Sequence, residues 1–270
     1  MQYYKILIVG FGNIGKHLYN EFTENPVGLD IYVFDPYIDC PEYLEKDHFT
    51  KTIENLEDIS FDFAFVCTPT EMRDNGSCDT SIVENVVRDL TTINVNVIVI
   101  KSTVPVDFCE VLSKSVKRLV LSPEYYGTTI NSPKKPNFLI LGGDKYLCSK
   151  VANLYYSFKS KDFRIRFTDY RTAALAKYME NCFLAMKVAF CSEFSIMAEN
   201  FGVSYQELRE IFILDERMGD SHTLIKNEQP YYDSHCLNKD IPGMIAQSKE
   251  ALLLKAVNNI NNFRKRKYKK

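Results

Sequence analysis

The sequence predicts an α/β fold, a doubly wound parallel sheet followed by an all-helical domain. Short runs rich in Val, Ile, Leu and Phe alternate with amphipathic segments through the first part of the chain, a pattern typical of strands joined by crossover helices. A glycine-rich turn follows the first of these runs. Beyond about Tyr170 the pattern changes, because residues 170–200 contain neither Gly nor Pro and repeat apolar side chains at helical spacing. We therefore expect an α/β domain over residues 1–168 and a helical domain over residues 169–270.

Six strands and four helices are predicted in the α/β domain. Their apolar runs are nearly continuous, which is typical of a parallel sheet covered by helices on both faces, with right-handed crossovers. The predicted strands are residues 4–10, 29–34, 62–67, 95–101, 118–121 and 137–141, and the predicted helices are residues 13–23, 80–90, 106–116 and 145–157.

The helical domain is predicted to begin with one long helix over residues 170–200, about 45 Å long at 1.5 Å per residue. A second helix is expected over residues 204–214, followed by a loop over residues 215–240. A last helix is expected to begin near Ile241 and Pro242, because Pro is tolerated in a first helical turn, and to run to about residue 263. The apolar side of the long helix is predicted to carry Ala174, Tyr178, Cys182, Ala185, Ala189, Ser192 and Ile196.

The composition argues against several classes of protein. The chain has 270 residues, 46% of them hydrophobic, and a formal net charge of -2, which suits one or two buried cores and not a nucleic-acid-binding surface. The basic tail, residues 264–270, is expected to be solvated, with a membrane or nucleic-acid patch as the alternative. The N-terminus does not resemble a signal peptide and no apolar run is long enough to span a bilayer, so we expect no membrane partner. Eight cysteines without a CxxC pair and four scattered histidines indicate a cytoplasmic protein with reduced thiols and no metal site.

Residues 10–15 (GFGNIG) follow the first predicted strand and open the first predicted helix. In this context the pattern predicts a dinucleotide site of the Rossmann type, with a purely structural turn as the alternative. Gly10 permits the tight turn, Gly12 lets the backbone approach a pyrophosphate, and Gly15 allows close packing of helix on strand. The helix N-terminus then offers N–H groups to the phosphates. The predicted cofactor-binding residues of this segment are Gly10, Gly12, Asn13, Ile14 and Gly15.

Asp35 stands twenty residues after Gly15, at the end of the second predicted strand. A carboxylate at this position accepts hydrogen bonds from the adenosine ribose and repels a 2′-phosphate, so NAD is predicted over NADP. Later strand ends supply further candidates, because ligands of such sheets bind at the carboxyl ends of the strands. These candidates are residues 67–70 after the third strand and residues 101–105 after the fourth, and from them Thr68, Pro69 and Thr103 are predicted to bind the cofactor. Ser or Thr near Pro is also common in ordinary loops.

Six segments, taken in order, form a larger pattern. They are residues 10–15, 66–70 (VCTPT), 101–105 (KSTVP), 122–125 (SPEY), 175–185 (LAKYMENCFLA) and 236–240 (CLNKD). With these segments the chain resembles the UDP-glucose/GDP-mannose dehydrogenases over nearly its whole length. Members of that family oxidise a sugar C6 hydroxyl to a carboxylate, so the resemblance implies the same fold, the cofactor NAD and the same class of reaction.

The resemblance also implies roles for particular residues. The implied set has Cys236 as the nucleophile, Lys177 and Asn181 as the oxyanion-stabilising pair, Asp240 and Thr103 as the residues that handle water, Glu124 as an acid that assists turnover, and Lys239 as a cofactor contact. Each has a plainer alternative. These alternatives are an incidental loop cysteine at Cys236, a solvated side chain at Lys177, a packing amide at Asn181 and a strand-end charge at Glu124.

The chemistry agrees with the implied roles. Lys177 and Asn181 are spaced i,i+4, so they share one helix face and can stabilise one alkoxide. A thiolate at Cys236 would trap the aldehyde as a thiohemiacetal, and a second hydride loss would leave a thioester for hydrolysis. A nearby Lys177 or Lys239 would favour that thiolate.

Two features depart from the family. The loop before the nucleophile is glycine-rich in the family, whereas residues 231–235 here are YYDSH, whose side chains occupy that space. His235 is either an added acid–base group or a space-filling side chain, and Asp233 adds a negative charge that would oppose both a thiolate and a diphosphate. Family members also continue into another α/β domain that holds the nucleotide, whereas this chain stops at Lys270. If the sequence is complete, the substrate is smaller, the third domain comes from another chain, or the activity is lost.

Three functions therefore stay open. The first is NAD-dependent oxidation of a nucleotide-sugar C6 alcohol to the carboxylate, of the UDP-glucose to UDP-glucuronate type. The second is an NAD-dependent dehydrogenase of a smaller hydroxy acid, which would not need Cys236, and the third is an NAD-binding protein without catalysis. We expect a homodimer, since the family's central helix, here residues 241–263, packs against its twin. The predicted apolar seam is Met244, Ile245, Leu252, Leu253, Leu254, Val257 and Ile260.

Overall fold

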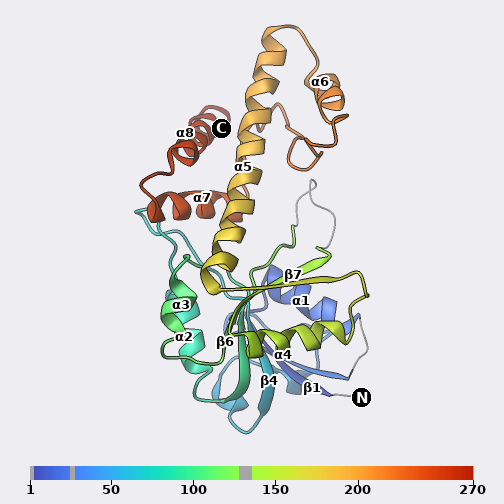
Figure 1. The fold of residues 1–270 in the computed structure, drawn as a ribbon, viewed down its shortest axis with the longest axis vertical. Coiled ribbons are helices and arrows are strands. Elements are labelled where there is room, and N and C mark those ends of the chain that lie inside the picture. Colours follow the sequence, from blue (N-terminus) through green and yellow to red (C-terminus); the bar gives the residue numbers. More distant parts are fainter. Residues whose placement is uncertain (1–2, 25–27, 128–135, 270) are drawn as a thin grey trace. The chain divides into compact units, whose positions relative to one another are not determined.

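A computed structural model describes residues 3–24, 28–127 and 136–269. The chain divides into two compact units (Figure 1). Unit 1 comprises Met1–Glu71, Asp79–Tyr125 and Pro136–Lys177, and unit 2 comprises Met72–Cys78, Tyr126–Lys135 and Tyr178–Lys270.

Unit 1 is built on an eight-stranded sheet in the order β3-β2-β1-β4-β5-β6-β7-β8. Every neighbouring pair is parallel except β6 and β7, so the predicted parallel sheet is confirmed apart from this one junction. Two strands, β3 and β8, were not predicted, because β3 has only two residues and β8 alternates Arg with apolar residues at an exposed edge. The strands are β1 Tyr4–Val9, β2 Leu29–Phe34, β3 Phe49–Thr50, β4 Ser60–Val66, β5 Asn94–Ile100, β6 Leu119–Leu121, β7 Phe138–Gly143 and β8 Arg164–Thr168.

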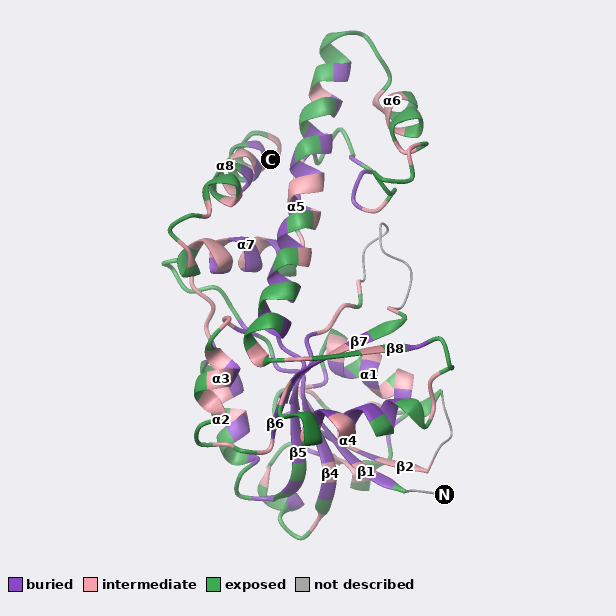
Figure 2. Ribbon diagram, in the orientation of Figure 1, coloured by how far each residue is buried: buried purple, intermediate pink, exposed green. Residues whose placement is uncertain are grey.

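Helices cover both faces of this sheet, as the near-continuous apolar strands predict. On one face, Ile6 and Ile8 of β1 belong to a core with side chains of α1 and α4. On the other face, Leu7 and Val9 belong to a core with side chains of α2 and α3. Figure 2 shows the buried residues concentrated in the strands and on the inner sides of these helices. The helices are α1 Asn13–Thr23, α2 Ser81–Asp89, α3 Phe108–Leu112 and α4 Lys145–Tyr156, with 3-10 turns η1 Lys46–His48 and η2 Glu54–Leu56.

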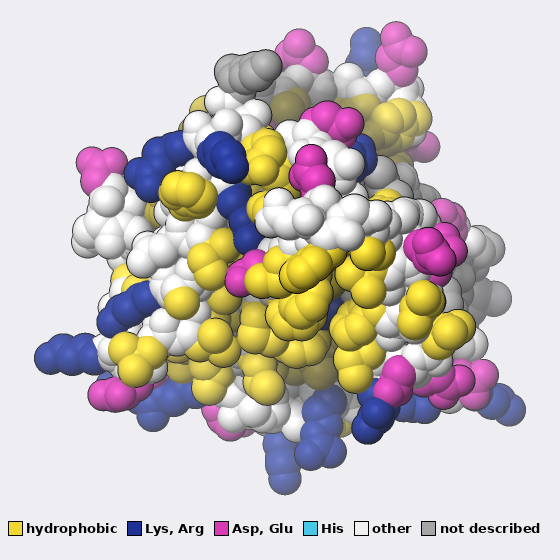
Figure 3. Space-filling model, turned by 90° about the horizontal axis from the view of Figure 1, so that it is seen from above, with side chains coloured by type: hydrophobic (Ala, Val, Ile, Leu, Met, Phe, Trp, Pro, Cys, Tyr) yellow, Lys and Arg dark blue, Asp and Glu magenta, His cyan; other side chains and the backbone are white. Residues whose placement is uncertain are grey.

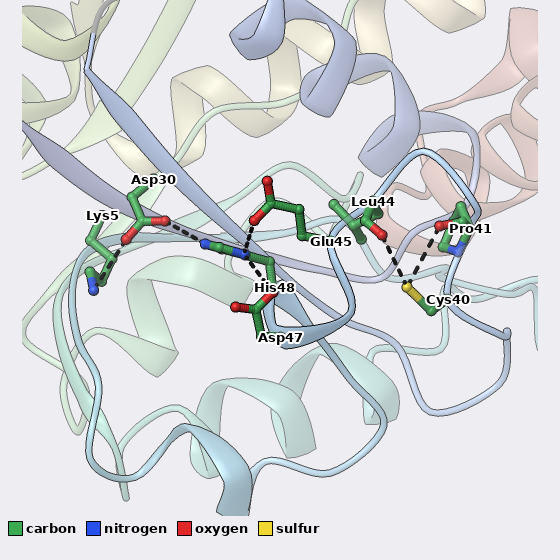
Figure 4. Close-up of polar contacts among 8 residues, drawn as sticks. All are labelled: Lys5, Asp30, Cys40, Pro41, Leu44, Glu45, Asp47 and His48. Carbon is green, nitrogen blue, oxygen red and sulfur yellow. Dashed lines mark hydrogen bonds and ion pairs between the residues drawn. The ribbon is translucent and has the colours of Figure 1, made fainter.

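An ion cluster around His48 ties the short edge strand β3 to β2 (Figure 4). The Nε2 atom of His48 lies 2.8 Å from Asp30 Oδ1, and Asp30 is paired with Lys5 at 3.2 Å. On the other side of the ring, Nδ1 lies 3.2 Å from Glu45 and 3.3 Å from Asp47. His48, Glu45 and Asp47 are close enough to hold a cation, but both carboxylates are largely exposed and their contacts with the ring already account for the grouping. The role of the cluster is therefore structural, and it is not treated as a metal site.

Unit 2 is helical, and its helices differ from the prediction after residue 215. The long helix α5 spans Tyr170–Asn200, crossing from unit 1 into unit 2, and α6 spans Tyr205–Phe212. The residues predicted for the apolar side of α5 are buried, except Ile196, which is half-buried. Beyond them, α7 spans His235–Gln247 and α8 spans Leu252–Tyr268.

The prediction that residues up to 240 form a loop and one helix follows is wrong. Ser234 caps α7, because its hydroxyl accepts a hydrogen bond from the N–H of Leu237 at 3.3 Å. The cysteine segment is therefore helical, and Pro242 lies inside the helix and not in its first turn. Ser248 then adopts an extended conformation that ends α7, so α8 is a separate helix.

The described part of the basic tail is helical to Tyr268, and Arg266, Lys267 and Lys269 are exposed, as expected of a solvated tail, whereas Arg264 is not. The side chain of Arg264 is buried, and its Nη1 donates to the carbonyl of Ala189 at 3.0 Å and to Ser192 Oγ at 2.6 Å. Both acceptors belong to α5, so Arg264 anchors α8 to the core of unit 2.

One helix among the described residues, α5, is long and apolar enough to cross a membrane by length and composition alone. The prediction that no segment reaches this length is therefore wrong. The finding is weak evidence for a membrane span, since the core helix of a globular unit passes the same test. Here Cys182, Ala185 and Ala189 pack in one core with residues of α7 and α8, which accounts for the apolar character of the helix.

Candidate functional site

Three glycines shape the turn between β1 and α1, each for a different reason. Gly10 has a φ of +87°, and a Cβ there would lie 3.1 Å from the carbonyl group of Cys67. A Cβ at Gly15 would lie 2.1 Å from the carbonyl oxygen of Gly10, so only glycine allows α1 to approach β1 this closely. A Cβ at Gly12 would meet no atom of the described chain within 4 Å. The backbone at Gly12 therefore faces open space, as a turn that receives a pyrophosphate must.

Asp35 is buried directly behind this turn. Its Oδ2 accepts a hydrogen bond from the N–H of Phe11 at 2.7 Å, and its Oδ1 accepts one from Tyr37 at 2.9 Å. The carboxylate thus holds the glycine turn against the end of β2. Each carboxylate oxygen has a second acceptor position, so the same group can accept a hydrogen bond from a ribose hydroxyl.

The loops after β4 and β5 are linked to each other. Ser102 Oγ donates to the carbonyl of Thr68 at 2.6 Å, and Thr70 Oγ1 donates to the carbonyl of Thr103 at 2.9 Å. The hydroxyl of Thr68 is buried and has no hydrogen-bond partner among the described residues, whereas Pro69 is exposed. An orphaned buried hydroxyl beside an open glycine turn fits a site that receives a polar cofactor.

Lys101, which the sequence offered only within the candidate segment 101–105, belongs to a further polar group of unit 1. Its side chain is only 3% exposed, and its Nζ lies 3.2 Å from Glu124 Oε2. Oε1 of Glu124 accepts a hydrogen bond from the N–H of Tyr125 at 2.9 Å. The KSTVP segment contained this lysine, but spacing alone does not reveal that its partner follows the next strand of the sheet.

Lys177 is also buried, which argues against a solvated helix surface. Its ammonium lies 4.6 Å from the centre of the Tyr125 ring, a cation–π distance. Tyr125 directly follows Glu124, so the structure gathers Lys101, Glu124, Tyr125 and Lys177 within unit 1.

In unit 2, Asp240 is the centre of a buried polar group. Asn181 Nδ2 donates to Asp240 Oδ2 at 2.5 Å, and Lys239 Nζ lies 2.6 Å from Asp240 Oδ1. Asp240 is 2% exposed, so an ionised carboxylate here needs both partners. Asn181 is therefore more than a packing amide, since its side chain orients a buried charge.

Cys236 occupies the first turn of α7 and is exposed. A thiol at a helix N-terminus is biased toward the thiolate by the partial positive charge of the helix end. Other cysteines differ, since burial raises the pKa of the Cys67 and Cys182 thiols to about 12. Cys236 precedes Asp240 by four residues on α7, so one helix carries the exposed thiol and the buried carboxylate one turn apart.

The structure thus describes two sets of predicted site residues, each within its own unit. Unit 1 contains the glycine turn with Asp35, the linked loops of Thr68 and Thr103, and the group around Glu124 and Lys177. Unit 2 contains Asn181, Lys239 and Asp240 together, with Cys236 on the same helix as the last two.

Two family models match the chain. The model for the UDP-glucose/GDP-mannose dehydrogenase family, NAD binding domain, matches residues 38–159, and the model for the central domain of that family matches residues 171–263. Together the two matches cover most of the chain, and they leave the glycine turn itself outside the matched range.

Individual proteins agree with the family models. The UDP-glucose 6-dehydrogenase of Campylobacter jejuni is 27% identical over 290 residues, covering 97% of this chain and 73% of that protein. The chain spans about half the length of other curated relatives that it matches. A solved UDP-glucose dehydrogenase from Pyrobaculum islandicum has a TM-score of 0.80 at 22% identity, covering 97% of this chain and 68% of that one.

A second solved structure shows that the fold is shared more widely. The 3-hydroxyisobutyrate dehydrogenase of Mycobacterium tuberculosis has a TM-score of 0.70 at 17% identity, covering 99% of this chain and 95% of that one. At such identities both likenesses are likenesses of fold alone. The fold therefore agrees with either kind of dehydrogenase, and the choice between them depends on the site residues.

Proposed function

Because the chain belongs to the UDP-glucose/GDP-mannose dehydrogenase family, we propose that it oxidises the C6 alcohol of a nucleotide sugar to the carboxylate. The cofactor is NAD, which when bound accepts hydride, and two equivalents account for oxidation of an alcohol to an acid. The observation that carries the proposal lies in unit 2. There an exposed helix-terminal thiol stands one turn from a buried carboxylate that is held by an amide and a lysine.

The cofactor would be held by unit 1. Gly12 and the N-terminus of α1, which has no side-chain cap, would receive the pyrophosphate. Asp35 would accept hydrogen bonds from the ribose, and Thr68 would donate its orphaned hydroxyl. Asn13, Ile14 and Pro69 are proposed as further contacts at the same turn and loop, and Lys239 as a contact from unit 2.

The reaction then depends on covalent capture at Cys236. Loss of the hydroxyl proton and of a hydride from C6 gives an aldehyde, and Lys177 and Asn181 would stabilise the alkoxide and each later oxyanion. The Cys236 thiolate adds to the aldehyde carbon, forming a C–S bond and a thiohemiacetal. Loss of a second hydride gives a thioester, and attack by water on the acyl carbon breaks the C–S bond and restores the thiolate.

The remaining residues would serve the hydrolytic step. Asp240 and Thr103 are proposed to orient the attacking water, and Glu124 is proposed to transfer protons during turnover. The ammonium of Lys101, 3.2 Å from Glu124, would hold that carboxyl group in place for this role.

NADH counted per substrate consumed tests this proposal. Purified protein and the Cys236→Ser variant would be assayed with UDP-glucose, GDP-mannose and related nucleotide sugars. Two NADH per substrate, lost in the variant, is the expected result. One NADH per substrate of a small hydroxy acid, unchanged by Cys236→Ser, would support the second kind of dehydrogenase. NAD binding without turnover of any of these compounds would support a non-catalytic protein.

We also propose a cytoplasmic homodimer formed through the helices of unit 2. The predicted seam requires one change, because Met244, Ile245, Leu254 and Val257 pack against the core of unit 2 itself. Leu252 and Leu253 stay exposed, and Figure 3 shows hydrophobic side chains gathered on one face of the molecule. The exposed large hydrophobic side chains of α5 and α6 include Phe183, Phe190, Phe194, Ile211 and Phe212. Sedimentation equilibrium would test self-association, and a monomer at micromolar concentration would contradict it.

A further inference from the structure

The segment before Cys236 carries a negative charge, the carboxylate of Asp233. Asp233 lies three residues before Cys236, just outside the N-cap of α7. Its Oδ1 accepts a hydrogen bond from Asn238 Nδ2 at 2.9 Å. The carboxylate therefore lies against Asn238 in the N-terminal part of α7, the helix whose first turn carries Cys236. A negative charge in this place opposes a thiolate and offsets the favourable field of the helix end.

Two lysines at the C-terminal end of α8, one in its last turn and one at its C-cap, contact the same carboxylate. Lys265 Nζ is hydrogen-bonded to Asp233 Oδ1, and Lys269 Nζ lies 3.2 Å from Asp233 Oδ2. Lys265 lies in the last turn of α8, and Lys269 is the C-cap residue, whose N–H donates to the carbonyl of Lys265. Each oxygen of Asp233 thus has its own ammonium partner.

This contact is part of a larger attachment of α8 to the segment. Asn261, one turn before Lys265, accepts from the N–H of Tyr232 at 2.8 Å and donates to the carbonyl of Tyr232 at 3.1 Å. Asn261 is 3% exposed, and Arg264 fixes α8 to α5 on the neighbouring turn. The C-terminal part of α8 therefore binds both the backbone of Tyr232 and the side chain of Asp233. The ion pairs of the two lysines are thus part of a fixed attachment and not isolated contacts on the surface.

We propose that Lys265 and Lys269 are positioning residues that neutralise Asp233, so that the helix N-terminus can still favour the Cys236 thiolate. The inference rests on the proposed function only in taking Cys236 as the nucleophile. The hydrogen bonds agree with it: although partial burial alone would raise the pKa of Asp233, contacts with Lys265, Asn238 and Lys269 lower it to about 2. Asp233 is therefore charged wherever a thiol titrates, and its charge needs compensation.

The other charged groups of unit 2 on α7 are accounted for separately. Lys239 and Asp240 pair with each other at 2.6 Å, so their charges largely cancel. His235 is exposed and adjoins Cys236 at the start of α7. All three are retained in every variant below, so they contribute equally to each measurement.

The test is the pH dependence of Cys236 alkylation by iodoacetamide, followed by peptide mass mapping and requiring no substrate. In the Lys265→Met/Lys269→Met variant, the midpoint is expected to rise by roughly half a pH unit, with alkylation about threefold slower below it. In Asp233→Asn the midpoint is expected to fall. The triple variant should return to the wild-type value, and the shifts should shrink in 1 M salt, where the Debye length is about 3 Å.

A matched control removes two charges from the same helix without touching Asp233. Arg266→Met/Lys267→Met changes two exposed residues of α8 and should leave the midpoint in place. Lys265→Gln, which keeps a hydrogen-bond donor near Asp233 and loses the charge, replaces the double variant if that variant does not fold. Thermal unfolding identifies such a case.

Opposite signs for the lysine and aspartate variants support charge neutralisation. If both variants raise the midpoint, the lysines only hold the segment in place, and if neither moves it, the thiol does not sense Asp233. Either result overturns the inference. These outcomes are independent of turnover. If the alkylation midpoint shifts as expected in a protein that oxidises no nucleotide sugar, the proposed function is contradicted and the inference stands.

Discussion

The two units build their polar sites in different ways. In unit 1 the candidate residues follow the carboxyl ends of neighbouring strands, so the register of β1, β2, β4 and β5 brings them together once the sheet forms. In unit 2, Cys236 lies in the first turn of α7, and side chains of α8 hold Tyr232 and Asp233, which precede that turn. Strand ends are thus positioned by a repeating backbone pattern, whereas a helix start depends on individual side chains. Mutations in the glycine turn of unit 1 should therefore act through backbone clashes, and mutations around α8 in unit 2 through lost side-chain hydrogen bonds and ion pairs.

The largest effect is expected from Gly15→Ala in unit 1. Its Cβ would lie 2.1 Å from the carbonyl oxygen of Gly10, so α1 must move away from β1. We expect the free energy of unfolding to fall by about 3 kcal/mol and NAD binding to be lost. Urea unfolding and titration calorimetry with NAD measure the two effects.

Gly12→Ala is the matched control for that variant. No atom of the described chain lies within 4 Å of the added Cβ, so stability should change by less than about 0.5 kcal/mol. The affinity for NAD should still fall by at least about tenfold, because a Cβ would stand where the pyrophosphate approaches. Unchanged affinity would show that the cofactor does not approach this turn.

The next largest effect is expected in unit 2 from Arg264→Met. The change removes both hydrogen bonds from α8 to α5 and leaves the Ala189 carbonyl and the Ser192 hydroxyl with fewer partners. We expect a loss of about 2–3 kcal/mol in the free energy of unfolding. Arg266→Met, an exposed change two residues away, should stay within about 0.5 kcal/mol. Equal effects of the two variants in urea unfolding would refute the anchoring role of Arg264.

A smaller effect is expected from Lys101→Met, which acts on a side-chain bond in unit 1. The change removes the ammonium 3.2 Å from Glu124, and we expect a loss of about 1–2 kcal/mol in stability. Lys101→Arg keeps a charged donor near Glu124 and should retain most of the stability. Equal losses for the two variants in urea unfolding would show that the ion pair does not stabilise unit 1.

The smallest effect concerns Asp233 and the acid stability of unit 2. The pKa of Asp233 is lowered from 3.8 to about 2 in the folded protein, so its ion pairs stabilise the fold above about pH 4, and this stabilisation is lost as the pH falls toward 2. Because the carboxylate is partly exposed, the contribution should be below about 1 kcal/mol. The stability difference between wild type and Asp233→Asn should therefore narrow between pH 5 and about pH 2. A difference that is constant over this range in urea unfolding would contradict the assignment.

Much of unit 1 could be predicted from sequence because its signals are local. Each near-continuous apolar run became a strand, and the glycine pattern between a strand and a helix became the expected turn. The errors have the same origin. The sequence does not predict β8, because RIRFT lacks an apolar run. It places the start of α7 too late, because a polar segment with a serine cap resembles a loop. The cap acts only when Ser234 is extended and α7 follows it.

By itself, the sequence determined the α/β class, the glycine turn with its carboxylate, the long helix α5 and the order of the motifs. These follow from patterns that repeat every two or 3.6 residues and from residue types that the backbone demands locally. Only the tertiary structure decided that Lys101 pairs with Glu124, that Arg264 is a core residue, and that Asp233 is bound by two lysines at the end of α8. The physical reason is that the two members of an ion pair can lie far apart along the chain, so no local sequence pattern indicates that they meet.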